Sequence, residues 1–321
     1  MAATEYGFEL ALCATLERET EWVVSRQHGG AVADPGGRIV DVVGVVPGPA
    51  FDDRAAITDR TIPPAAVAAD VGVGRARRPE RAFDCHPERR EEAVEAAVDC
   101  GFLASEHDGT ERRVRQTTRY PDGWVDELVA VENKPDLDRP GDLRAQLRLD
   151  ASLGLFDRVV LATATHVTGA HRNRVPESVG IWEFDPETGE RTVVRPPDRL
   201  PVDEPGVEPG EAHDGRTAVT VVSADEKAAR RRVVAERAYG KGWRPSSYPA
   251  CARCEPDENG LPYCAAYDRV VAPGSDCGDD CPRREPADPP AVDADALRAS
   301  RTPWVRDPPG TRRRQTGLDQ F

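Results

Sequence analysis

Glu132 and Lys134 form a Glu-x-Lys tripeptide that ends a predicted strand beginning at Val125. Side chains alternate between the two faces of a strand, so these two side chains share a face. A carboxylate and an ammonium on one face can hold a divalent ion and a water together, as metal-assisted hydrolysis of a phosphodiester requires. Only three lysines occur in 321 residues, and arginine supplies the rest of the positive charge. A compact ammonium kept at Lys134 indicates a task that a guanidinium would not perform.

The residues after the tripeptide predict the elements that position it. Residues 136–141 are rich in Pro, Gly and Asp and indicate a turn. Leucines from Leu143 to Leu155 then recur mainly at helical spacing, and Gln146 lies among them. The apolar run Val159 to Ala162 is typical of a buried strand. The expected unit is therefore strand, helix, strand, with an acid and a base where the first strand ends.

A second acid is expected upstream. Residues 38–46 predict a strand with turn signals on both sides, and Asp41 interrupts its apolar run. Burying an unpaired carboxylate is costly, so Asp41 should meet a cation or a hydrogen-bond donor. Asp122, in a Tyr-Pro-Asp sequence ten residues before Glu132, is the second choice for this acid. Asp126, on the same face of the strand as Glu132, is the third.

A helix predicted over Glu5 to Val24 carries one further acid, Glu9. The order of helix, Asp strand, Glu-x-Lys strand and Gln-bearing helix resembles the PD-(D/E)XK, or restriction-endonuclease-like, nuclease superfamily. The resemblance implies an α/β fold with a mixed-sheet core. It also implies a catalytic set whose members are Glu9, Asp41, Glu132, Lys134 and Gln146. In that set Asp41 and Glu132 would hold Mg²⁺, Lys134 would orient the water, and Gln146 would support the site. The whole chain also resembles an uncharacterised family from haloarchaea.

If Asp41 belongs to this set, residues 52–120 are an insertion between two core strands. A helix beginning near Ile62, a helix over Pro87 to Cys100 and a hairpin over Phe102 to Thr118 are expected there. This order resembles a winged helix. The wing would contact nucleic acid through three arginines of its return strand, Arg112, Arg113 and Arg115. The alternative is a small helical insertion with a solvated arginine face.

The C-terminal part contains a cysteine module in which five cysteines lie at loop spacings: Cys251-x2-Cys254-x9-Cys264-x12-Cys277-x3-Cys281. Such spacing is typical of a tetrahedral metal site, for which four of the five suffice. Apolar residues between 244 and 292 are too few for a core, so a metal would have to fold the segment. Structural zinc is the expected metal. An iron–sulfur cluster and unligated thiols are the alternatives.

The predicted domain organisation follows from these segments. Residues 1–51 and 121–194 form the nuclease-like core, 52–120 the winged-helix-like insertion and 195–222 an acidic linker. Residues 223–290 hold a basic helix and the Cys-rich metal module, and 291–321 form a tail. The fold class is thus α/β, with one inserted and one C-terminal module.

Composition limits the environment of the chain. A net charge of −14 with so few lysines is typical of proteins from extreme halophiles, where salt screens surface charge and weakens phosphate contacts. No apolar stretch reaches the roughly 18 residues of a membrane-spanning helix, and no signal peptide opens the chain. We therefore expect a cytoplasmic protein with no membrane partner, whose cysteines bind metal or are buried as thiols rather than form disulfides.

Three functions remain open at this point. The first is a magnesium-dependent nuclease acting on nucleic acid, with DNA as the preferred partner. The second is a DNA-binding protein on a nuclease-like scaffold that has lost catalysis. The third is a zinc-stabilised adaptor that binds protein. The first requires Asp41, Glu132 and Lys134 to lie within a few ångströms of one another.

Overall fold

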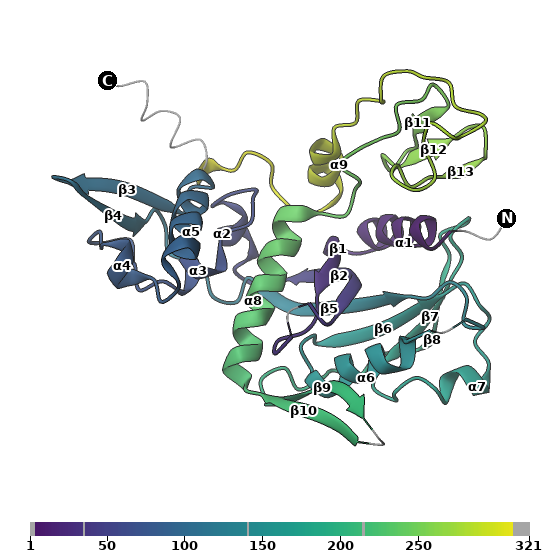
Figure 1. Cartoon of the computed structure of the whole chain (residues 1–321), viewed down its shortest axis with the longest axis horizontal. Coiled ribbons are helices and arrows are strands. Elements are labelled where there is room, and N and C mark those ends of the chain that lie inside the picture. The colour runs from purple at the N-terminus through teal and green to yellow at the C-terminus, as the bar shows by residue number, and fades with distance from the viewer. Residues whose placement is uncertain (1–3, 35, 140, 214–215, 311–321) are drawn as a thin grey trace.

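The apolar runs form the centre of a mixed sheet. In the computed structural model, which describes residues 4–310 except 35, 140, 214 and 215, the sheet has the strand order β1-β2-β5-β6-β7-β8 (Figure 1). Its strands are β1 (Val23–Gly29), β2 (Ile39–Pro47), β5 (Val125–Asn133), β6 (Arg158–Thr163), β7 (Gly180–Phe184) and β8 (Arg191–Arg195). The central strands β5, β6 and β7 are parallel, and every other neighbouring pair is antiparallel. Parallel strands are covered on both faces, which explains why β5 and β6 are nearly continuous apolar runs.

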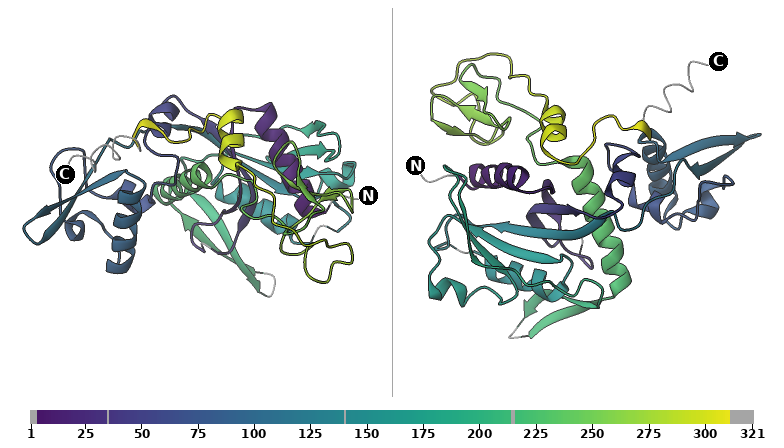
Figure 2. Two further views of the ribbon diagram at one scale, coloured as in Figure 1. Left: turned by 90° about the horizontal axis from the view of Figure 1, so that it is seen from above. Right: turned by 180° about the vertical axis from the view of Figure 1, so that it is seen from behind.

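Helices cover both faces of this sheet. They are α1 (Glu5–Glu19), α6 (Leu143–Leu153) and α8 (Ala224–Lys241). Val129 and Val131 of β5 pack in one cluster with Phe8 of α1. Leu128 and Leu147 belong to the cluster on the opposite face, which α6 shares with α8. The architecture is therefore a mixed α/β arrangement of three layers, with β5 buried at its centre (Figures 1 and 2).

The first helix is shorter than the sequence predicts. Its N-cap Thr4 accepts a hydrogen bond from the amide of Gly7, at 3.1 Å. Its last turn is closed by Thr20, whose amide and hydroxyl both donate to the carbonyl of Leu16. Val23 and Val24 leave the helix and pair with β2, because β-branched side chains favour a strand. The predicted helix over Glu5 to Val24 is wrong over its final residues.

The segment between β2 and β5 forms a separate lobe at one side of α8 (Figure 1). It contains α2 (Phe51–Ala55), α3 (Pro64–Ala68), α4 (Pro79–Ala82), α5 (Pro87–Asp99), β3 (Leu103–Asp108) and β4 (Glu111–Gln116). The predicted hairpin is confirmed, since β3 and β4 pair antiparallel from Leu103 opposite Gln116 to Asp108 opposite Glu111. Arg77, just before α4, forms an isolated bridge with Val114 of β4.

A fully buried ion pair joins this lobe to the rest of the molecule. Arg54 of α2 contacts Glu236 of α8 at 2.6 Å, and neither side chain is exposed. The amide of Ile62 and the hydroxyl of Tyr120 donate to the same carboxylate, at 2.9 and 2.8 Å. Arg54 also donates to the carbonyls of Thr58 and Arg60. Both ends of the insertion are thus fixed on one glutamate.

The segments predicted as a linker and a tail both contain secondary structure. The expected linker 195–222 contains a hairpin of β9 (Gly206–His213) and β10 (Arg216–Val222), which packs on α6. Glu208 of this hairpin accepts the amides of Val32, Ala33 and Asp34 at 2.8 to 3.0 Å, and these contacts explain its burial. The linker prediction is therefore wrong.

The expected tail 291–321 contains α9 (Ala294–Arg301) and a buried Trp304, whose indole donates to the carbonyl of Asp59. The tail prediction is wrong up to residue 310, and residues 311–321 lie outside the described part. The remaining elements are α7 (Gly169–Arg172) and a small sheet of β11 (Cys254–Pro256), β12 (Pro262–Cys264) and β13 (Arg269–Val270). Within the described ranges, no helix has the length and apolarity to cross a membrane.

His28 of β1 provides a test of the packing between β1 and α8. Burial, together with Lys241, Arg237 and Arg230 of α8, lowers the pKa of His28 to about 3. Its Nε2 lies 2.8 Å from the Ser25 hydroxyl, which itself donates to the carbonyl of Gly242. The folded state therefore keeps this imidazole neutral where the unfolded chain would protonate it.

We expect acidification to destabilise the protein through His28. Between an unfolded pKa of about 6.5 and the lowered folded pKa, the unfolded state binds one more proton, so stability is lost as pH falls. From pH 6.5 to 5 the wild type should lose up to about 2 kcal/mol more than His28→Gln. Urea unfolding at fixed salt across this range measures the difference, and parallel pH profiles would contradict it.

Candidate functional site

Asp41 and Glu132 meet where β2 and β5 lie side by side. The antiparallel register pairs Val42 with Val131, so continuing it by one residue brings Asp41 opposite Glu132. Side chains at directly opposite positions have Cβ atoms about 5 Å apart. The Asp41 carboxylate accepts the amide of Asn133 at 2.8 Å, which fixes it at the end of β5. Two acids from different parts of the chain therefore lie together at the end of the apolar strand.

Arg38 holds Glu132 from the side of the sheet that α6 covers. Its guanidinium contacts Glu132 at 2.7 Å and Asp150 of α6 at 2.7 and 3.2 Å. All three side chains are buried. One guanidinium thus serves two carboxylates, with two hydrogen bonds to Asp150 and one to Glu132.

Glu9 reaches the same strand end from the other side of the sheet. Its carboxylate pairs with Arg26 at 2.7 Å and accepts from the amides of Gln27 and Asn133 at 2.9 and 3.4 Å. The Gln27 amide also lies 3.5 Å from Asp41. Gln27 has a φ of 58°, a left-handed conformation that is uncommon outside glycine and is found preferentially at functional sites.

The carboxylates are not fully compensated. Burial, followed by the charge of Asp41, raises the pKa of Glu132 to about 8, although Arg38 opposes this. Burial, followed by the charges of Glu9 and Glu5, raises the pKa of Asp41 to about 6, against the hydrogen bond from Asn133. Perturbed acids of this kind, brought together by several elements, mark a candidate site for a cation or for proton transfer.

The other predicted residues lie differently. The Lys134 side chain is half-buried just after β5, and the structure gives its ammonium no hydrogen-bond or ion-pair partner among the described residues. Gln146 is half-buried on α6. Asp150, one turn further on, is the α6 residue that binds Arg38, which also binds Glu132. Asp126 is exposed near the other end of β5, about 20 Å from Glu132 at the rise of a strand, and Asp122 is exposed in the turn before that strand. Neither can join this site.

Three contributors were missed from the sequence: Arg38, Asn133 and Asp150. Asn133 lies between the two residues of the tripeptide, and its buried Oδ1 has no hydrogen-bond partner in the described structure. Arg38 had a signal, since a basic residue three positions before a buried acid is a natural partner for nearby carboxylates. Asp150 had none, because an acid on an amphipathic helix is usually solvated.

The arginines of the predicted wing are already paired. Arg112 contacts Glu91 of α5 at 2.5 Å, Arg113 contacts Asp108 at 2.8 Å, and Arg115 contacts Glu106 at 2.5 Å. The exposed charged side chains of α5 are mostly acidic: Glu88, Arg89, Glu91, Glu92, Glu95 and Asp99. This helix therefore presents negative charge to solvent, which is unfavourable for insertion into a DNA groove.

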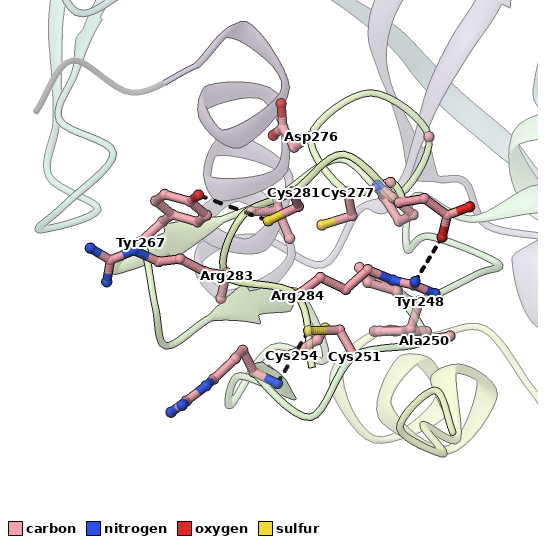
Figure 3. A pocket seen from close by; sticks show the side chains of 18 of the residues that line it. Tyr248, Ala250, Cys251, Cys254, Tyr267, Asp276, Cys277, Cys281, Arg283 and Arg284 are labelled. Carbon is pink, nitrogen blue, oxygen red and sulfur yellow. Dashed lines mark hydrogen bonds and ion pairs between the residues drawn. The ribbon is translucent and has the colours of Figure 1, made fainter. Parts of the chain in front are cut away.

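The cysteine module encloses a cavity. The five cysteines from Cys251 to Cys281 all line it, and its volume is about 390 Å³ (Figure 3). Within the described part of the chain, however, no three His, Cys, Asp or Glu side chains are grouped so as to hold a metal ion, either here or beside Glu132.

Comparison with known proteins places the chain in a family without giving it an activity. Residues 23–286 match the model of a family of unknown function, DUF5787, and the chain belongs to that family. Searches of the curated proteins and of the solved structures find no match. The matched range includes the β2–β5 site, the insertion and the cysteines, but it begins after Glu9.

The buried Arg38 pairing gives a stability prediction. Arg38→Ala leaves Glu132 and Asp150 buried without their cation, and breaking such a pair costs about 3–5 kcal/mol. Arg158→Ala is the matched control, because Arg158 forms a half-exposed pair with Glu127 at 2.8 Å, and an exposed pair contributes only about 0–1 kcal/mol. Urea unfolding at constant molar salt compares the two variants. Equal losses would show that the Arg38 contacts contribute no more than a surface pair.

Proposed function

We propose that this DUF5787 protein is a metal-dependent nuclease that hydrolyses phosphodiester bonds in DNA. The observation that carries the proposal is the pair of acids on neighbouring strands, the half-buried Asp41 and the buried Glu132, whose pKa values are both raised. They lie beside the Glu-x-Lys sequence that resembles the PD-(D/E)XK superfamily. The order α1, β1, β2, β5, α6, β6 agrees with the order of elements which that resemblance implies.

The donor set suits magnesium. Mg²⁺ is usually held by one or two carboxylates, and its remaining positions are filled by water and substrate phosphate. Asp41 and Glu132 would supply the carboxylates, and the unpartnered Oδ1 of Asn133 is a further oxygen donor at the same strand end. The ion supplies a water of lowered pKa and neutralises charge on the phosphate. The protein's own part is to hold the two acids, and Lys134, which follows the same strand, would orient a water.

One observation favours the second candidate, a DNA-binding protein on the same scaffold without catalysis. Glu132 is engaged by Arg38 at 2.7 Å, so a cation has to compete with a buried guanidinium. An inactive descendant would keep such a pair as a permanent replacement for the ion. The two candidates differ in whether a metal ion displaces Arg38 from Glu132.

The nuclease proposal predicts the effect of removing each acid without changing its shape. Asp41→Asn and Glu132→Gln should each reduce magnesium-dependent cleavage of DNA by orders of magnitude, because both remove a charged ligand. Asp126→Asn is the matched control, since it makes the same change on the same strand at its far, exposed end. Cleavage is measured in molar salt with and without Mg²⁺.

The outcomes separate the candidates. Cleavage by the wild type and by Asp126→Asn, with loss of cleavage in Asp41→Asn and Glu132→Gln, supports the nuclease. Binding of duplex DNA without cleavage by any of the proteins supports the inactive scaffold. Cleavage by Glu132→Gln at the wild-type rate would remove Glu132 from the site.

DNA binding is assigned to the hairpin rather than to α5. Exposed ion pairs contribute about 0–1 kcal/mol, so Arg112, Arg113 and Arg115 can exchange their carboxylate partners for phosphates at little cost. Contacts of this kind position a protein on the duplex without reading its sequence. The acidic face of α5 repels the same phosphates.

Changing these three arginines to serine should weaken duplex binding. It should also reduce the slope of the logarithm of the binding constant against the logarithm of salt concentration, by roughly one unit per lost phosphate contact. Arg89→Ser/Arg90→Ser on α5 is the control, because it removes charge from the same lobe away from the hairpin. Affinity across a salt series, compared per arginine removed, measures the effect. Coincident curves for the wild type and the triple variant would leave the hairpin without a role in binding.

A further inference from the structure

The cysteine module has almost no hydrophobic core of its own. From residue 251 to residue 292 its buried apolar side chains are Leu261 and Val271, together with the thiol-bearing Cys254 and Cys264. Its strands β11, β12 and β13 are only two or three residues long. Segments of this size require a cross-link or a metal to compensate for their conformational entropy. All five cysteines of this module are free thiols.

The cysteines converge although they come from separate loops. Figure 3 shows Cys251 and Cys254 on one side of the cavity and Cys277 and Cys281 on the other. Cys264 also lines the cavity, because it lies directly opposite Cys254 in the antiparallel pair of β11 and β12. Neither local packing nor a disulfide accounts for five thiols around one space.

Two backbone amides point at the first sulfur. The amides of Arg253 and Glu285 donate to Sγ of Cys251 at 3.4 and 3.5 Å. Donors of this kind stabilise negative charge on a sulfur, and outer hydrogen bonds to ligand atoms are a regular part of metal sites. They are placed as outer hydrogen bonds to a ligand sulfur of Cys251 would be.

Four of the five sulfurs, those of Cys251, Cys254, Cys264 and Cys277, line the cavity without a side-chain hydrogen-bond partner among the described residues. Cys281 differs, because its sulfur lies 3.8 Å from the hydroxyl of Tyr267 and is engaged at the edge of the cavity (Figure 3).

We propose that this cavity binds one Zn²⁺ through the four sulfurs of Cys251, Cys254, Cys264 and Cys277, and that Cys281 is not a ligand. The four thiols bind as thiolates and release their protons. A Cys-x2-Cys pair followed by single cysteines from later loops matches tetrahedral structural zinc. It matches neither of the closely spaced cysteine runs of the common iron–sulfur proteins. The sulfurs have to close from the walls of the cavity onto the ion, so metal binding and ordering of the module are one event.

The metal also stabilises α1, because the module and the chain leading into it pack on that helix. Leu261 and Val270 belong to the same cluster as Phe8 and Leu16. Before the module, the Trp243 indole donates to Glu17 at 3.0 Å, and the Arg244 guanidinium pairs with the same buried carboxylate. Loss of zinc should therefore loosen the helix that carries Glu9, whether or not the protein is a nuclease.

Metal content of the purified full-length chain tests the ligand set. We expect one equivalent of zinc in the wild type, in Cys281→Ser and in the control Cys85→Ser, whose thiol belongs to the inserted lobe. Cys254→Ser and Cys264→Ser should lose it. Traces of zinc in the wild type, or iron with visible absorbance, would overturn the proposal. Retention in Cys264→Ser with loss in Cys281→Ser would overturn the assignment of the four ligands.

A second measurement covers the case in which the cysteine variants do not fold. A strong chelator added to the folded wild type should make residues 251–292 sensitive to protease, and added zinc should restore protection. Mass spectrometry of the fragments locates the cleavage. An unchanged cleavage pattern after complete removal of the metal would show that zinc does not hold the module together.

Discussion

Buried carboxylates require a cation in this protein, and arginine provides it at nearly every position. The chain has a net charge of −14 and only three lysines, yet it buries several acids completely. Arg54 holds Glu236, Arg231 holds Asp157 at 2.6 Å, and Arg244 holds Glu17. A guanidinium suits this task because its planar fork binds a carboxylate and leaves donors for backbone carbonyls. The same arginines fix the insertion on α8, α8 on the segment before β6, and the chain leading into the C-terminal module on α1.

The end of β5 departs from this rule. Glu132 and Asp150 share Arg38. Asp41 accepts one short hydrogen bond, from the backbone amide of Asn133, and Glu9 pairs with Arg26. Counting these four acids against two arginines leaves the site short of positive charge. Elsewhere among the described residues each buried acid has an arginine or, in Glu208, three backbone amides, so the shortage here is local and indicates a place for a further cation. The shortage is one of charge alone and does not depend on the resemblance to a nuclease family.

The sequence predicted the parts of this arrangement that lie along one strand. The apolar run before Glu132, the turn after it and the leucine helix each have a strong local pattern, and Asp41 was recognisable as an acid inside an apolar strand. Asp150 and Gln27 were not, because their roles depend on which residues the sheet register and the helix packing bring together. Arg38 stood near Asp41 in the sequence, but only the register shows that it pairs with Glu132. Gln146 was chosen from the resemblance, whereas the turn of α6 presents Asp150 to the strand.

The folded segments that the sequence assigned to a linker and a tail were missed for a similar reason. Residues 195–222 are rich in Pro, Gly and acids, which locally indicates a loop. Glu208 nevertheless finds three amides of the β1–β2 connection, and this long-range contact fixes the hairpin. Trp304 likewise packs in the central hydrophobic cluster and donates to the carbonyl of Asp59 in the insertion, contacts that its own segment does not indicate.

The geometry around Arg38 bears on whether Glu132 can accept a metal ion. Arg38 makes two hydrogen bonds to Asp150 and one to Glu132. If a cation takes Glu132, the guanidinium keeps its bidentate partner, and no buried charge is left alone. If Asp150 were displaced instead, two contacts would be lost and a fully buried carboxylate would remain unpaired, which is far more costly. Glu132 is therefore the acid that can leave Arg38 at least cost, and it is also the acid nearest Asp41 and the strand end. The ion pair is compatible with a metal site that Arg38 neutralises while no metal is bound.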